Sequence, residues 1–165
     1  MMIRDATEAD AAAIAAIYAH HVLHGTASYD LDPPPAEYHR DKIISVLGEG
    51  WPYLVAEDGG EVVGYAYATQ MRPRAAYRFT AEDSIYVHSD RQRRGTGRAL
   101  LEALLERSAA CGFRTMIAVV GGAEPASVAL HEVLGFQQVG RLTRVGFKFG
   151  RWLDSVYLQR DLPPA

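Results

Sequence analysis

Gln92-Arg93-Arg94-Gly95-Thr96-Gly97 decides the fold, since it follows a strand-like run, Ser84 to Val87, and leads into a helix-like run that begins at Arg98. Two glycines let the backbone turn tightly and approach a ligand closely. The first N–H groups of a helix have no partner within the helix, so they point at whatever lies in front of them. The stretch therefore predicts an anion cradle that suits a pyrophosphate group.

Other phosphate loops fit this stretch less well. A Walker loop needs Lys followed by Ser or Thr, and these residues do not follow Gly95 at the right spacing. The dinucleotide fingerprint Gly-x-Gly-x-x-Gly needs a third glycine where Leu100 stands. Six residues alone leave one alternative open, a solvated Arg-rich loop that starts a helix.

Composition limits the class of protein. The 165 residues suffice for an ordinary core, so we expect a single domain over residues 1–165. A net charge of −3 argues against nucleic acid or anionic membrane as partner, and the arginines near the glycine loop favour a small polyanion. The single cysteine, Cys111, argues against a disulfide or a Cys-based metal site, and we expect no metal. The lack of a long apolar run or signal-peptide pattern predicts a cytoplasmic protein.

Strands and helices are expected in an order that defines the fold class. The expected strands are 3–6, 53–57, 61–68, 80–87, 115–120, 136–143 and 153–159, and the expected helices are 8–24, 33–47, 98–111 and 126–134. The early strands form a hairpin, whereas helices separate later strands. This order predicts an α/β (α+β) fold, with a mixed, mostly antiparallel sheet of about six to seven strands flanked by about four helices.

The glycine loop in this architecture resembles the acetyl-coenzyme A (acetyl-CoA) signature of the GCN5-related N-acetyltransferase (GNAT) superfamily, Gln/Arg-x-x-Gly-x-Gly/Ala. Within it, the chain looks like the phosphinothricin and methionine sulfoximine acetyltransferases over nearly its full length. The most group-specific stretch is Gly-x-Lys-x-Gly-x-Trp-x-Asp, from Gly146 to Asp154. The resemblance implies the GNAT fold and acetyl transfer from acetyl-CoA to the α-amine of a small amino acid analogue, such as phosphinothricin, methionine sulfoximine or methionine sulfone.

The resemblance also implies where the coenzyme binds. The backbone of Ile85, Tyr86 and Val87 would pair with the amide-bearing pantetheine arm as an added strand does. The pyrophosphate would be wrapped by the residues Arg93, Arg94, Gly95, Thr96, Gly97 and Arg98. The family usually has Asn where this chain has Glu124, and an ionised carboxylate only accepts hydrogen bonds. Ser127 is then either a coenzyme contact or a helix cap.

Two residues match the group's positions for proton transfer. Glu82 stands at the group's general-base position at the start of its strand. The alternative is an ordinary strand-end carboxylate that faces solvent or an arginine, as we expect for Asp83 beside it. His131 would protonate the departing thiolate or act as an additional base, although a histidine on a helix is often a surface or core residue. A backbone N–H near Val87 would stabilise the oxyanion.

Arg72, Arg74 and Tyr77 precede the expected base, at positions that resemble the group's substrate contacts. A guanidinium suits the carboxylate of an amino acid, although loop arginines are often only solvated. Tyr29 and Asp30 would line the same mouth.

The C-terminal stretch has two interpretations. Lys148, Trp152 and Asp154 would shape either a loop near the substrate mouth or a dimer contact. The resemblance to a dimeric group, together with aromatic residues such as Phe147 and Phe149, indicates a homodimer.

Two competing functions remain. The acceptor could be a polyamine, an aminoglycoside or a protein N-terminus, but such acceptors are mostly cationic and the Arg72–Arg74 loop disfavours them. The chain could also be a coenzyme-binding sensor without turnover, which Glu124 allows and the retained Glu82 and His131 disfavour.

Overall fold

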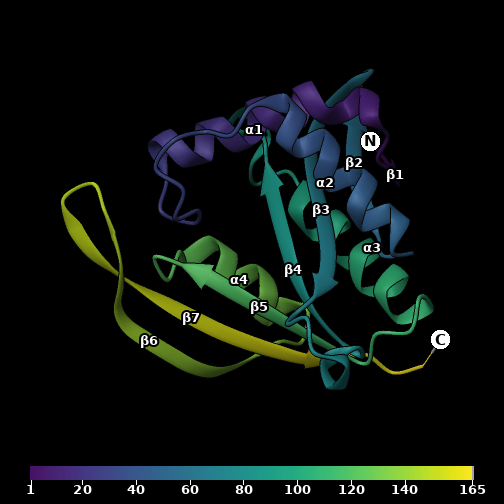
Figure 1. Cartoon of the computed structure of the whole chain (residues 1–165). Coiled ribbons are helices and arrows are strands. Elements are labelled where there is room, and N and C mark those ends of the chain that lie inside the picture. The colour runs from purple at the N-terminus through teal and green to yellow at the C-terminus, as the bar shows by residue number, and fades with distance from the viewer. Residues whose placement is uncertain (165) are drawn as a thin grey trace.

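One seven-stranded sheet, of order β1-β2-β3-β4-β5-β7-β6, organises the computed structural model, which describes residues 1–164 (Figure 1). Its strands are β1 (Met2–Asp5), β2 (Tyr53–Asp58), β3 (Glu61–Gln70), β4 (Thr80–Val87), β5 (Thr115–Gly121), β6 (Gln137–Lys148) and β7 (Arg151–Asp161). The helices are α1 (Ala11–His24), α2 (Ala36–Gly48), α3 (Thr96–Ala110) and α4 (Pro125–Val133). Neighbouring strands pair antiparallel except β4 and β5, which pair parallel. The predicted fold class is confirmed.

The two faces of the sheet carry two cores, because successive residues of a strand point to opposite faces. Leu54 belongs to the core under α3, together with Leu100. Its neighbour Val55 belongs to the core under α1 and α2, together with Ile14 and Ile43. Strand β4 follows the same alternation, so its odd-numbered residues face the α3 and α4 side and its even-numbered residues face the α1 and α2 side.

Strands β4 and β5 separate part-way along their length. Their register joins Thr80–Glu82 to Thr115–Ile117. Beyond Glu82, β4 continues along β3 as far as Val87, while β5 continues along β7 as far as Gly121. The two strands therefore diverge, as Figure 1 shows. This divergence leaves one edge of β4 without β5 as a partner from Asp83 onward.

Some boundaries differ from the prediction. The first helix begins with a 3₁₀ turn at Glu8–Asp10, and the second begins at Ala36 because Pro35 is still extended. The last two strands are longer than expected and form a hairpin that turns at Phe149 and Gly150, both with positive φ. Lys148, Trp152 and Asp154 all lie in these two strands. None of the helices in residues 1–164 is long and apolar enough to cross a membrane.

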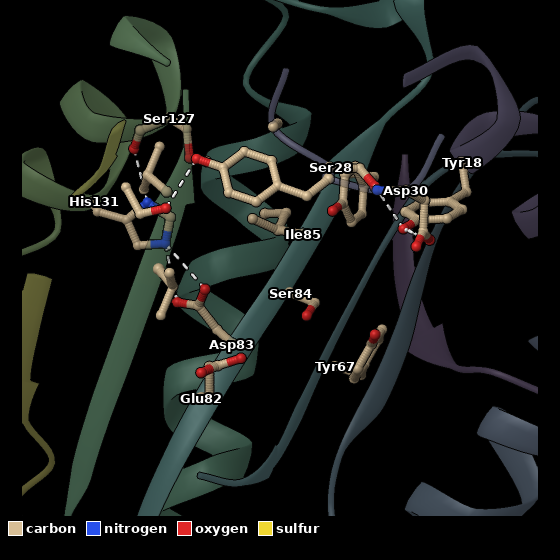
Figure 2. Close-up of a pocket in the computed structure, with 17 residues that line it drawn as sticks. Tyr18, Ser28, Asp30, Tyr67, Glu82, Asp83, Ser84, Ile85, Ser127 and His131 are labelled. Carbon is tan, nitrogen blue, oxygen red and sulfur yellow. Dashed lines mark hydrogen bonds and ion pairs between the residues drawn. The ribbon is translucent and has the colours of Figure 1, made fainter. Parts of the chain in front are cut away.

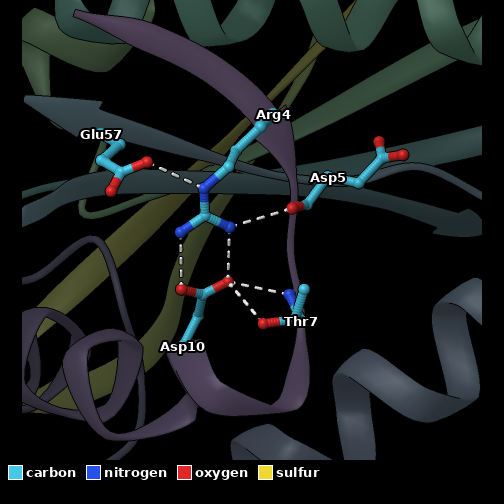
Figure 3. A network of polar contacts seen from close by, with 5 residues as sticks. All are labelled: Arg4, Asp5, Thr7, Asp10 and Glu57. Carbon is cyan, nitrogen blue, oxygen red and sulfur yellow. Dashed lines mark hydrogen bonds and ion pairs between the residues drawn. The ribbon is translucent and has the colours of Figure 1, made fainter. Parts of the chain in front are cut away.

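A partly buried network of ion pairs, in which Asp10 is the buried member, ties β1 to the start of α1 (Figure 3). The Arg4 guanidinium donates to both carboxylate oxygens of Asp10 at 2.9 Å and to Glu57 at 3.0 Å. Asp10 also accepts from the Thr7 backbone N–H at 2.8 Å, which completes a capping box. Burial raises the pKa of Asp10, but the bonds from Arg4 and Thr7 outweigh burial and hold the pKa below its ordinary value.

Replacing Arg4 with Met should lower the free energy of unfolding by about 2 to 3 kcal/mol, because the buried Asp10 carboxylate loses its partner. The lowered pKa stabilises the fold above the ordinary value of 3.8, and this stability is lost as pH falls through the folded pKa. The difference in stability between the wild type and the variant should therefore shrink as pH falls. Urea unfolding at several pH values measures both effects.

Arg107→Met is the matched control, since Arg107 pairs with Asp5 of the same strand in an exposed bridge of 2.9 Å. Its cost should stay below about 1 kcal/mol. Equal losses in the two variants would contradict the role assigned to Asp10.

Candidate active site

A cavity of about 420 Å³ lies at the edge of β4 that β5 leaves (Figure 2). Its lining comes from both strands, from the connector between α1 and α2, and from α4. The lining residues are Tyr18, Ala27–Asp30, Tyr67, Glu82–Tyr86, Val119–Gly121, Ser127, His131 and Ser155. Consecutive residues of β4 line it although they point to opposite faces, so the cavity opens along the strand edge and reaches both sides of the sheet.

Glu82 lines the cavity from the α1 and α2 side. Burial raises the pKa of Glu82 above its ordinary value, and the charge of Asp83 raises it further, while Arg72 and Lys42 oppose the shift. Lys42 extends from α2 to lie 5.5 Å from the centre of the Tyr67 ring. A carboxylate with a raised pKa is a stronger base than an exposed one. The geometry thus suits Glu82 to accepting a proton.

His131 lines the cavity from the α4 side and is paired with Asp83. Its Nε2 lies 3.0 and 3.2 Å from the two carboxylate oxygens of Asp83, and its Nδ1 lies 2.7 Å from the carbonyl oxygen of Ser127. His131 is 1% exposed and Asp83 is 8% exposed. The interpretation of Asp83 as a solvent-facing carboxylate was therefore wrong. The strand alternation gave a signal, since Asp83 shares its face with the core residue Ala81.

Two opposing effects set the pKa of His131. Burial lowers it, but the hydrogen bond and charge of Asp83, together with the Ser127 carbonyl, outweigh burial and raise the pKa above its ordinary value. The raised pKa keeps the ring charged at a higher pH than a free histidine.

The glycine loop lies at the N-terminus of α3. Gly95 adopts a left-handed conformation with φ of 81° as the N-cap, and its carbonyl accepts from the Ala99 N–H at 3.0 Å. This is the first hydrogen bond of the helix, so the N–H groups of Thr96, Gly97 and Arg98 before it have no acceptor within the helix. This cradle fits a pyrophosphate.

The arginines of this loop differ in their contacts. Arg93 and Arg94 are exposed, and Arg93 has a positive φ of 62°. Arg98 is exposed and bonds to Glu102 at 2.9 Å. Arg91 instead pairs with Asp58 at 2.8 Å, so it anchors the loop to the β2–β3 turn.

A family model described as an acetyltransferase (GNAT) domain matches residues 3–157. The chain belongs to the GNAT acetyltransferase family.

Relatives of this acetyltransferase carry related activities. It is 50% identical to a phosphinothricin N-acetyltransferase of Alcaligenes faecalis, over 97% of this chain and 82% of the relative. It is 40% identical to an L-methionine sulfoximine/L-methionine sulfone acetyltransferase of Salmonella typhimurium, over 98% and 95% of the two chains. A solved phosphinothricin acetyltransferase from Sinorhizobium meliloti, in complex with acetyl-CoA, superposes with a TM-score of 0.95 at 48% identity, covering 98% of this chain and 88% of that one.

Glu124 of this acetyltransferase caps α4. Its carboxylate oxygens accept from the N–H groups of Ala126 at 3.1 Å and Ser127 at 2.8 Å. The carboxylate that stands in place of the family's usual Asn therefore forms hydrogen bonds within the protein. The interpretation of Ser127 as the helix cap was wrong, and its place in the cavity wall leaves it as a candidate contact.

The loop before β4 does not line the cavity. Arg72, Arg74 and Tyr77 are exposed and lie outside the residues that line the cavity. Arg72 lies close enough to act on the pKa of Glu82. The Gln70 side chain donates to the carbonyls of Arg72 and Arg74 at 2.6 and 3.1 Å, which holds the loop.

Residues of the C-terminal hairpin hold the α1–α2 connector over the cavity. The buried Lys148 donates from Nζ to the Ser28 carbonyl at 2.8 Å. The Tyr29 hydroxyl donates to the Asp154 carbonyl at 2.9 Å and accepts from the Gly122 N–H at 3.1 Å. For Lys148 and Asp154, these contacts agree with the first of the two expected roles, that of shaping a loop near the cavity. Lys148 fixes one wall of the cavity.

Glu124→Ala should lower the unfolding free energy by about 1 kcal/mol, because α4 loses the acceptor for two N–H groups. Ser127→Ala, three residues away in the same helix, keeps the cap and should change stability by less than about 0.5 kcal/mol. Urea unfolding compares the two variants. A larger loss for Ser127→Ala than for Glu124→Ala would contradict this assignment of the cap.

Proposed function

We propose that residues 1–165 form one N-acetyltransferase domain that moves the acetyl group of acetyl-CoA to the α-amine of a small amino acid analogue. Phosphinothricin, methionine sulfoximine and methionine sulfone are the proposed acceptors. One observation carries the proposal: a cavity at the edge of β4 has Glu82 on one side and the Asp83–His131 pair on the other. Full-length relatives that acetylate such compounds support the acceptor class.

The coenzyme would bind from the α3 and α4 side, where the glycine loop lies. Backbone N–H groups from Gly95 to Arg98, with the side chains of Arg93 and Arg94, would hold the pyrophosphate. The edge of β4 at Ile85, Tyr86 and Val87, beyond its register with β5, would pair with pantetheine. When bound, acetyl-CoA supplies an acetyl group activated as a thioester.

The acceptor would approach from the α1 and α2 side. Glu82 takes a proton from the amine there, directly or through water. Arg72, Arg74 and Tyr77, from the loop before β4, bind the carboxylate and side-chain oxygens. His131 lies on the opposite side and donates a proton to the departing thiolate. A backbone N–H near Val87 stabilises the oxyanion.

We also propose that the enzyme works as a homodimer in the cytoplasm. Phe147, Phe149 and Trp152 of the β6–β7 hairpin are each more than half exposed, at 57%, 56% and 55%. Aromatic residues of this kind favour interfaces. A single-chain mass in light scattering at micromolar concentration would rule the dimer out.

Thiol release from acetyl-CoA across a panel of amines tests the function. Phosphinothricin and methionine sulfone should be far better acceptors than spermidine or a peptide. Neither spermidine nor a peptide has a free α-carboxylate beside its amine. Arg74→Ala should raise KM for the best acceptor more than it lowers kcat. Equal acetylation of spermidine would contradict the acceptor class, and coenzyme binding without thiol release for any amine would favour a sensor.

Glu82→Gln should lower kcat by roughly two to four orders of magnitude, because the amide keeps the shape but cannot accept the proton. Affinity for acetyl-CoA should change little. In the wild type, kcat/KM should fall as pH falls through the pKa of Glu82, which lies above the ordinary 4.5. Steady-state kinetics and calorimetry measure these effects.

Glu132→Gln is the control, since Glu132 is an exposed carboxylate whose partner is Gln138. It should retain the wild-type turnover. A Glu82→Gln variant with half of the wild-type kcat would show that another group removes the proton.

A further inference from the structure

We propose that Asp83 is a positioning residue that keeps His131 in its acidic, imidazolium form at the pH at which the acceptor amine is free. This inference rests on the proposed function, and it adds a residue to which the sequence analysis assigned no role.

Hydrogen bonding fixes the protons of the pair. The Ser127 carbonyl can only accept, so Nδ1 of His131 carries a hydrogen at 2.7 Å. An ionised Asp83 can also only accept, so Nε2 carries a hydrogen as well at 3.0 Å. A ring with both hydrogens is an imidazolium. Loss of the second proton would set a bare nitrogen lone pair against a carboxylate in a site that is 1% exposed, which is costly.

The groups around the ring support this assignment. Asp83 projects from β4, and the Ser127 carbonyl belongs to the same helix as His131. Phe136, just before β6, packs its uncharged ring perpendicular to the His131 ring, with 4.9 Å between the two ring centroids. Glu82 lies on the other face of β4, where the charge of Asp83 acts on it. Glu132, next to His131, faces outward to Gln138.

The reaction needs such an acid because the amine must be deprotonated at the same pH at which the imidazole is still protonated. The α-amine of a peptide becomes free near pH ~8, and that of a free amino acid at higher pH because of its own carboxylate. An ordinary imidazole, with a pKa of about 6.5, is mostly neutral there. A free thiol has a pKa of about 8.5, so an acid with a raised pKa matches the leaving thiolate better. Asp83 thus widens the pH range in which a free amine and a protonated acid coexist.

The proton balance closes with these groups. As the C–N bond forms and the C–S bond breaks, Glu82 takes one proton from the amine nitrogen. The departing sulfur takes the proton that His131 shares with Asp83. Exchange with water then returns a proton to the pair and removes one from Glu82.

NMR titration of the His131 ring in the free protein tests the pair without any substrate, with His131→Gln to assign the signal. The wild-type ring should titrate above the ordinary value of 6.5. Asp83→Asn, which keeps the shape and removes the charge, should lower that midpoint by at least one unit, about tenfold in proton affinity. Asp30→Asn is the control: Asp30 also lines the cavity but bonds to Tyr18, so the midpoint of His131 should not move.

The pH profile of kcat/KM links the pair to catalysis. The alkaline limb should move to lower pH in Asp83→Asn by the same amount as the NMR midpoint. The acid limb, set by Glu82 and by the acceptor amine itself, should stay within about half a unit. Asp83→Glu, which keeps the charge, should restore part of the limb. A purely structural role would instead lower activity by one factor at every pH.

A wild-type His131 that titrates at or below 6.5 would overturn the proposal even if Asp83→Asn does not fold. An unmoved midpoint, or an unmoved alkaline limb, in a folded Asp83→Asn variant would overturn it too. Absence of acetyl transfer by the wild type would contradict the proposed function instead, and the NMR titration would still decide the protonation of the pair.

Discussion

The separation of β5 from β4 after Glu82 is the constraint on which the site depends. A sheet edge inside a protein must find other partners for its peptide groups or leave a cavity that a ligand can enter. Here the α1–α2 connector and α4 surround the opening without closing it. The glycine loop follows the same strand, so the chain that provides the open edge also leads into the anion cradle of α3.

Because β4 is pleated, consecutive residues point to opposite faces of the sheet and have different surroundings. Glu82 faces the side of α1 and α2, and Asp83 faces His131 on α4. Burial and the nearby charge of Asp83 raise the pKa of Glu82, while the same Asp83 raises the pKa of His131. In the proposed mechanism, one buried carboxylate would therefore strengthen the base on one side of the sheet and preserve the acid on the other.

Local patterns predicted the elements and much of the cavity wall. Alternation and turn residues located β4, and the glycines located the start of α3, because both depend on neighbours in sequence. Contacts between distant residues could not be predicted this way. His131 meets Asp83 from 48 positions away, and Lys148 reaches Ser28 from 120 positions away. The cap at Glu124 was missed because the position was interpreted only as a departure from the family's Asn.

A crystal structure of the protein with coenzyme A and an amino acid acceptor would test the central claim most directly. The open edge of β4 predicts the coenzyme sulfur on the His131 side of that edge, with the pyrophosphate at the N–H groups of Thr96 to Arg98. It also predicts the acceptor nitrogen on the Glu82 side, facing α1 and α2. A sulfur and a nitrogen that both lie on one side of the sheet, or a pyrophosphate away from the glycine loop, would contradict this arrangement.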